Sequence, residues 1–184
     1  MSEIVRLSLV SHAMTDATAA GRFPIDEPLS ALGHRQADAA AEPGDVDAAY
    51  CGPEKRARQT AELLGLSAVV DSRLADLEYG SWRGAGLSDV PPADLAVWLT
   101  EPSQAPHGGE SVVELVERVR GWMDGLASAR GRIVAVTHPA VIRAAVLVAL
   151  DAPPRSFWRL DIAPLSRTVL HLRGQAWTLR SSRG

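Results

Sequence analysis

Two apolar segments that each end in a histidine constrain the fold of this chain more than any other feature. The segment "LSLVSH" ends at His12, and "IVAVTH" ends at His138. Near-continuous apolar runs are typical of strands in a parallel sheet that helices cover on both faces. Because ligands of such sheets bind beyond the carboxyl ends of the strands, we expect both imidazoles to face a ligand there.

Helical segments alternate with the expected strands. Ser30 is a suitable N-cap for a helix that runs to about Glu42, and another helix is expected from about Pro53 with Gly65 as its stop. The clearest helix follows Ser111, where a capping box precedes a stripe of apolar residues at helical spacing. This alternation predicts an α/β fold, a three-layer sandwich with a mostly parallel central sheet and helices on both faces.

Length and composition narrow the class of protein. The chain has 184 residues, and we expect one domain over residues 1–184. A net charge of -3 gives no electrostatic reason to expect nucleic acid or an acidic membrane surface. Cys51 is the single cysteine, so no internal disulfide or thiolate metal cluster can form.

No segment resembles a membrane span or a secretory signal, and we expect a cytoplasmic protein. A homodimer is compatible with the sequence, although no feature establishes one.

Charged residues follow other strands at the same expected edge. Arg56 and Arg58 lie in the first turns of a helix after the short strand "VDAAYC", and Asp76 and Glu78 lie in a loop ahead of Gly80. Two imidazoles, an arginine and an acid suit phosphoryl transfer. An imidazole can carry the group covalently, a guanidinium binds phosphate oxygens, and a carboxyl group can protonate the leaving oxygen.

Several segments together resemble the histidine phosphatase superfamily, which contains the cofactor-dependent phosphoglycerate mutases and many small phosphatases. They are "SHAMT", "PLSALGHRQA", "GPEKRARQTA", "LADLEYGSWRG", "GGES" and "VTHPAVIR", and they cover nearly the whole chain. The resemblance implies a phosphoglycerate mutase-like fold. The segment between Gly84 and Gly109 is too short for the larger cap of mutase-like members, so a small phosphatase is favoured over a mutase.

The resemblance also assigns roles to individual residues. It implies that His12 is the nucleophile, His138 a phosphate-contacting partner and Arg56 the phosphate-binding arginine. Counting back from the motif glycine places Asp76 at the proton donor, with Glu78 as the alternative acid. Further substrate-binding candidates are Ser11 and Thr15 in the first motif, Thr18 just after it, the basic residue Arg22, and Ser111 at a helix start. No metal ion or organic cofactor is implied.

The first motif departs from the family pattern. Ser11 stands where the family has arginine, Ala13 where it has glycine, and Thr18 where asparagine is frequent. A serine hydroxyl carries no charge and cannot form a two-pronged contact. Losing a preorganised donor of this kind typically lowers the rate on the order of 10²- to 10³-fold. An uncompensated Ser11 therefore predicts weakened or altered activity.

Three interpretations follow from this departure. In the first, another cation such as Arg83, Arg22 or Arg58 supplies the missing charge. In the second, the pocket serves a less charged or bulkier substrate or catalyses a different reaction. In the third, the site is degenerate and the chain acts as a binding module. A metal site built on His12, His138 and a carboxylate is a further alternative, but the compact ligand spacing typical of such sites is missing.

The sequence thus predicts a phosphomonoesterase that forms a phosphohistidine intermediate on a small phosphorylated metabolite. The alternative prediction is a repurposed or catalytically degenerate protein with the same fold.

Overall fold

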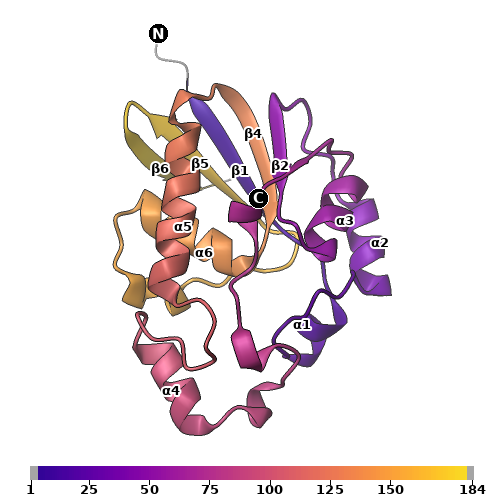
Figure 1. Ribbon diagram of the computed structural model, residues 1–184. Coiled ribbons are helices and arrows are strands. Elements are labelled where there is room, and N and C mark those ends of the chain that lie inside the picture. Colours follow the sequence, from indigo (N-terminus) through magenta and orange to yellow (C-terminus); the bar gives the residue numbers. More distant parts are fainter. Residues whose placement is uncertain (1–3, 182–184) are drawn as a thin grey trace.

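The computed structural model describes residues 4–181, which contain one six-stranded sheet in the order β3-β2-β4-β1-β5-β6 (Figure 1). Its strands are β1 (Val5–Ser11), β2 (Ala48–Cys51), β3 (Val69–Val70), β4 (Gly131–Thr137), β5 (Arg167–Arg173) and β6 (Ala176–Arg180). The pairs among β1 to β4 are parallel, whereas β5 pairs antiparallel with both β1 and β6. The prediction of a mostly parallel central sheet is confirmed.

The helices alternate with these strands as predicted. They are α1 (Asp16–Ala20), α2 (Ala31–Ala39), α3 (Lys55–Leu63), α4 (Pro92–Thr100), α5 (Val112–Gly125) and α6 (Pro139–Ala149). Ser30 caps α2 by accepting a hydrogen bond from the Gly33 amide, and Ser111 forms the expected capping box with Glu114. Both helix starts therefore follow directly from local sequence.

Two predicted helix limits were wrong, each for a local reason. Helix α2 ends at Ala39 rather than near Glu42, because Glu42 precedes Pro43 and a residue before proline is disfavoured in helical conformation. Helix α3 begins at Lys55 rather than near Pro53, because Glu54 has extended backbone angles and serves as its N-cap residue.

The helices form layers on both sides of the sheet, which confirms the three-layer arrangement (Figure 1). Successive side chains of a strand point to opposite faces. Leu7 and Leu9 of β1 therefore belong to the large core cluster that also contains the buried residues of α5 and α6. Val10 belongs instead to a smaller cluster with Ala61 and Leu64, on the side of α3. Among residues 4–181, no helix combines the length and the apolar character that crossing a membrane requires.

The pairing of β1 with β4 brings the two histidines to one edge. The strands run parallel in a register that places Ser11 opposite Thr137. The amide of His12 donates a hydrogen bond to the Thr137 carbonyl at 2.9 Å. Both strands end at this point, so His12 and His138 leave the sheet side by side.

Gly33 of α2 lies close to the segment after β1. Its replacement by alanine should therefore change stability in the opposite direction from the same replacement at an uncrowded helix glycine. A Cβ atom added at Gly33 would lie 2.0 Å from the Met14 carbonyl oxygen, whereas one added at Gly121 in α5 meets nothing within 4 Å. We expect Gly33→Ala to lower the free energy of unfolding by about 1–3 kcal/mol through overpacking. The matched Gly121→Ala should raise it by up to about 1 kcal/mol through helix propensity. Urea denaturation measures both, and a stabilising Gly33→Ala would contradict the close approach.

Candidate active site

His12 presents one ring nitrogen for chemistry because the other is bound to the backbone. It is 6 % exposed, and its Nδ1 lies 2.7 Å from the Ala13 carbonyl oxygen. A carbonyl only accepts, so Nδ1 carries the proton and the neutral ring keeps its lone pair on Nε2. Burial, then repulsion from His138 and Arg56, lowers the pKa of His12 to about 3. His12 is therefore a neutral imidazole with a nucleophilic Nε2 at physiological pH.

His138 lies beside His12 and is held by carboxylates. It is fully buried at the start of α6, and the centroids of the two imidazole rings are 5.2 Å apart. Its Nε2 lies 2.7 Å from Glu54 Oε2. Its Nδ1 lies 3.5 Å from Asp76 Oδ2 and, among the described residues, has no hydrogen-bond partner. A Cβ at position 52 would come within 3.0 Å of His138 Nε2, so Gly52 leaves room for this ring.

Glu54 is a site residue that the sequence analysis missed. Besides His138, its carboxylate accepts a hydrogen bond from the Asp76 amide at 2.8 Å. Burial raises the pKa of Glu54, but the hydrogen bond and attraction of His138 outweigh it and lower the pKa to about 2. The ionised carboxylate only accepts, so His138 Nε2 is the donor. A usable signal was present, since glutamate is not a preferred N-cap residue and Glu54 makes no side-chain cap to α3.

Arg56 and Asp76 form a buried ion pair next to His138. Arg56 is 2 % exposed, and its Nη2 donates to Asp76 Oδ2 at 2.6 Å. Its Nη1 donates to the Ile25 carbonyl at 2.9 Å. Asp76 Oδ1 accepts a hydrogen bond from the Leu77 amide at 2.8 Å. The carboxylate of Asp76 therefore occupies one side of the Arg56 guanidinium.

The loop that carries Asp76 is fixed from outside the site by Arg118. This guanidinium donates to the carbonyl oxygens of Arg73, Ala75 and Asp76 at 2.8, 2.9 and 3.3 Å. It also forms two hydrogen bonds with the Glu110 carboxylate, at 2.8 and 2.7 Å. A single α5 side chain thus sets the backbone path that aims Asp76 at His138.

The alternative acid, Glu78, lies farther out. Its side chain is 57 % exposed, and its carboxylate accepts a hydrogen bond from the Gly80 amide at 3.1 Å. Arg83, at 4.0 Å from Glu78, is 50 % exposed. Both line a pocket of about 120 Å³ together with Arg56 and Asp76. Arg83 is thus the candidate compensating cation that shares a pocket with the buried pair.

The polar residues of the first motif are buried but uncharged. Ser11 is 0 % exposed, and its Oγ has no hydrogen-bond partner within residues 4–181. Thr15 caps α1, accepting from the Thr18 amide at 3.1 Å, and the two threonine hydroxyls lie 3.0 Å apart. The structure therefore leaves Ser11 as the unsatisfied hydroxyl of this motif.

The other predicted binding residues lie apart from the ion-pair cluster. The Ser111 hydroxyl accepts from the Glu114 amide at 3.1 Å, and Arg22 and Arg58 are exposed. In the described part of the chain, no hydrogen bond or ion pair joins these three residues to the cluster. The same residues contain no group of three or more His, Cys, Asp or Glu side chains placed to hold a metal ion.

Comparison with known proteins identifies relatives with this arrangement of elements. The chain is 28% identical over 184 residues to phosphoserine phosphatase 1 of Hydrogenobacter thermophilus, covering 92% of this chain and 87% of that protein. It is 32% identical over 180 residues to glucosyl-3-phosphoglycerate phosphatase of Mycobacterium tuberculosis, covering 83% and 78%. The solved mycobacterial glucosyl-3-phosphoglycerate phosphatase in complex with VO3 superimposes with a TM-score of 0.86 at 29% identity, covering 95% and 96% of the two chains.

The sequence pattern of the histidine phosphatase superfamily (branch 1) matches residues 7–183. That range includes both strand-end histidines and all of the sheet except the first two residues of β1. The chain belongs to the histidine phosphatase superfamily.

Proposed function

We propose that this chain hydrolyses phosphate monoesters by transferring the phosphoryl group to His12. The observation that carries the proposal is the hydrogen bond from His12 Nδ1 to the Ala13 carbonyl, which leaves Nε2 unprotonated. Attack by Nε2 forms an N–P bond and breaks the bond from phosphorus to the ester oxygen. Water then cleaves the N–P bond and releases phosphate. The names of the relatives, phosphoserine phosphatase and glucosyl-3-phosphoglycerate phosphatase, support this reaction class.

Binding of the phosphate would rearrange the ion pair next to His12. Arg56 can exchange its 2.6 Å contact with Asp76 for a phosphate oxygen, since guanidinium binds both kinds of oxyanion. The freed carboxylate of Asp76 then takes up a proton from solvent and delivers it to the leaving oxygen. The exposed position of Glu78 favours Asp76 as this donor. The substrate is a small phosphorylated metabolite.

Glu54 would act as a positioning residue for His138. Its ionised carboxylate holds Nε2, which orients the ring so that Nδ1 faces the space beside Asp76 and His12. A histidine fixed by a carboxylate in this way can form an imidazolium that stabilises charge on the transferring phosphoryl group. The proposal thus gives Glu54 a role that acts through His138 rather than on the substrate.

Ser11 limits the charge available to the reaction. In the described cluster, Arg56 is the buried arginine and is paired with the Asp76 carboxylate, while the Ser11 hydroxyl contributes no charge. Arg83 lines the same pocket as Arg56 and supports the first interpretation, in which another cation assists. A homodimer, a cytoplasmic location and a single domain stay predictions from the sequence.

The role of His12 as the nucleophile is tested by replacing His12 and, separately, a control histidine. With an aryl phosphate and a chelator present, His12→Ala should abolish hydrolysis, because no other Nε2 takes its place. The exposed α2 residue His34 provides the matched control, and His34→Ala should keep wild-type activity. Labelled phosphate trapped on wild type should be stable in alkali and lost in acid, as expected for phosphohistidine. Retained activity in His12→Ala, or loss on chelation, would exclude the proposed mechanism.

The variant Ser11→Arg tests whether the lack of a positive charge at this position limits the rate. If charge limits the rate, the variant should hydrolyse the aryl phosphate on the order of 10- to 100-fold faster than wild type, part of the gain that a preorganised donor provides. An inactive wild type that Ser11→Arg activates would indicate a repurposed site on an intact scaffold. Inactivity of wild type, Ser11→Arg and His12→Ala alike on a panel of phosphate monoesters would favour the binding-module alternative.

The lowered pKa of His12 predicts the pH profile of the wild type. Because the pKa is about 3, His12 is already unprotonated at pH 4, and no activity should be lost between pH 6.5 and 4 through its protonation. The measurement is kcat/KM from pH 4 to 8, corrected for ionisation of the substrate. A decline on acidification centred near 6.5 would show that His12 titrates normally.

The role of Glu54 is tested by Glu54→Gln. Because the amide carries no charge to hold His138, kcat should fall roughly 10- to 100-fold. The loss should appear in kcat rather than in KM, because Glu54 acts through His138 and not on the substrate. Glu54→Asp should recover part of the rate, and Glu62→Gln, exposed on the same helix, should change neither quantity. An unchanged kcat in Glu54→Gln, or a change in KM alone, would contradict this positioning role.

A further inference from the structure

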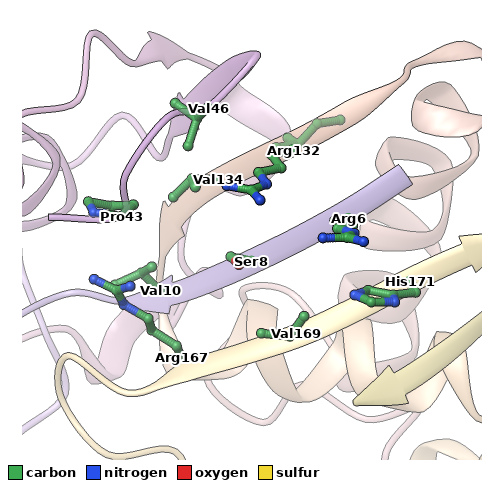
Figure 2. Close-up of a pocket in the computed structure, with 11 residues that line it drawn as sticks. Arg6, Ser8, Val10, Pro43, Val46, Arg132, Val134, Arg167, Val169 and His171 are labelled. Carbon is green, nitrogen blue, oxygen red and sulfur yellow. The ribbon is translucent and has the colours of Figure 1, made fainter. Parts of the chain in front are cut away.

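A hollow of about 260 Å³ lies on the part of the sheet that α2 and α3 leave uncovered (Figure 2). Strands β1, β4 and β5 form its floor, and Pro43 and Val46 form one wall. Arg6 lies six positions before His12 on β1, which corresponds to about 20 Å along an extended strand. We call this feature the strand-face hollow, and it is separate from the active site.

The hollow contains a row of basic side chains on neighbouring strands. The strand register places Arg132 opposite Arg6, and Arg6 opposite His171. Figure 2 shows all three among the residues that line the hollow, and none of the lining residues is acidic. Like charges directly opposite each other in a sheet are destabilising. The row therefore carries an electrostatic cost that a bound anion would remove.

The nearest acidic residues do not neutralise this row. Asp45 and Asp47 border an adjoining hollow that Arg6 and Arg132 also line. The Asp47 carboxylate accepts from the backbone amide of Arg132 at 2.7 Å. Within residues 4–181, neither the Arg6 nor the Arg132 guanidinium forms an ion pair. Both are exposed and available to an incoming ligand.

His171 provides an independent sign of an unfilled polar position. Its Nδ1 is buried and has no hydrogen-bond partner among the described residues. Burial, followed by repulsion from Arg180, Arg6 and Arg173, lowers the pKa of His171. The positive field thus extends along β5 and across to β6.

The shape and chemistry of the hollow favour a compact ligand. Its floor between the charged ends is formed by Ser8, Val134 and Val169, which lie in one row of the sheet. Arg167 lies at the opposite end, where it donates to the Ala41 carbonyl. Guanidinium groups bind phosphate oxygens through paired donors. A ligand with two or more negative charges can contact neighbouring arginines at once.

We propose that the strand-face hollow binds a small phosphate compound that carries at least two negative charges. Arg6 and Arg132 hold its oxygens, and His171 contributes a hydrogen bond. This binding does not depend on the phosphatase activity proposed for the His12 site.

Calorimetric titration with inorganic pyrophosphate tests the proposal. Arg6→Gln/Arg132→Gln should weaken binding at least tenfold, because the paired charges are lost. The control Arg35→Gln/Arg155→Gln removes the same charge from exposed positions elsewhere and should bind within twofold of wild type. Orthophosphate should bind wild type at least tenfold more weakly than pyrophosphate. Hydrolysis of aryl phosphate should keep its kcat and KM in both double variants, which separates this result from the active site.

Thermal unfolding gives a second reading that does not require tight binding. Pyrophosphate should raise the melting temperature of wild type and of the control, but not of Arg6→Gln/Arg132→Gln. The single variant Arg6→Gln should itself melt above wild type without ligand, since a repulsive neighbour is removed. Equal pyrophosphate affinity in both double variants would overturn the proposal, as would the absence of binding to wild type. So would an equal loss of affinity in the control.

Discussion

The parallel pairing of β1 with β4 is the constraint on which the active site depends. The register that sets Ser11 opposite Thr137 makes both strands end together, and it places the His12 and His138 rings 5.2 Å apart. The His12 amide is bound to the Thr137 carbonyl, so the backbone itself fixes this separation. Because Nδ1 is bound to the Ala13 carbonyl, the same turn leaves Nε2 as the ring nitrogen available for the proposed reaction. A slip in register between β1 and β4 would move the His12 ring relative to the His138 ring.

Carboxylates then determine how the site holds its charges. Glu54 binds His138, and Asp76 binds Arg56, so each basic partner of His12 already has an acidic neighbour. This network balances buried charge in the absence of substrate. In the proposed reaction, a phosphate would displace Asp76 from the arginine, which would couple binding to release of the proposed acid. Because Ser11 is uncharged, it would attract a phosphate less strongly than a second arginine and would assist this exchange less.

The carboxyl edge of the sheet and its uncovered face differ in how their charges are paired. At the carboxyl edge, acidic and basic groups are paired and buried. On the uncovered face, Arg132, Arg6 and His171 stand opposite one another without acidic partners in the described residues. Both arrangements of charge follow from the strand order, which places β1 between β4 and β5. The same central strand therefore carries the proposed nucleophile at its end and the proposed anion-binding arginine near its start.

Local sequence determined much of the fold and part of the site. The apolar runs ending in His12 and His138 predicted the strands and their shared edge, and capping by Ser30 and Ser111 predicted two helix starts. The spacing of the motifs predicted Arg56 and Asp76 as site residues. Only the tertiary structure showed that Glu54 binds His138, 84 positions away in the chain, and that the Ser11 hydroxyl has no partner. Such contacts depend on strand order and register, which bring together side chains that no local pattern relates.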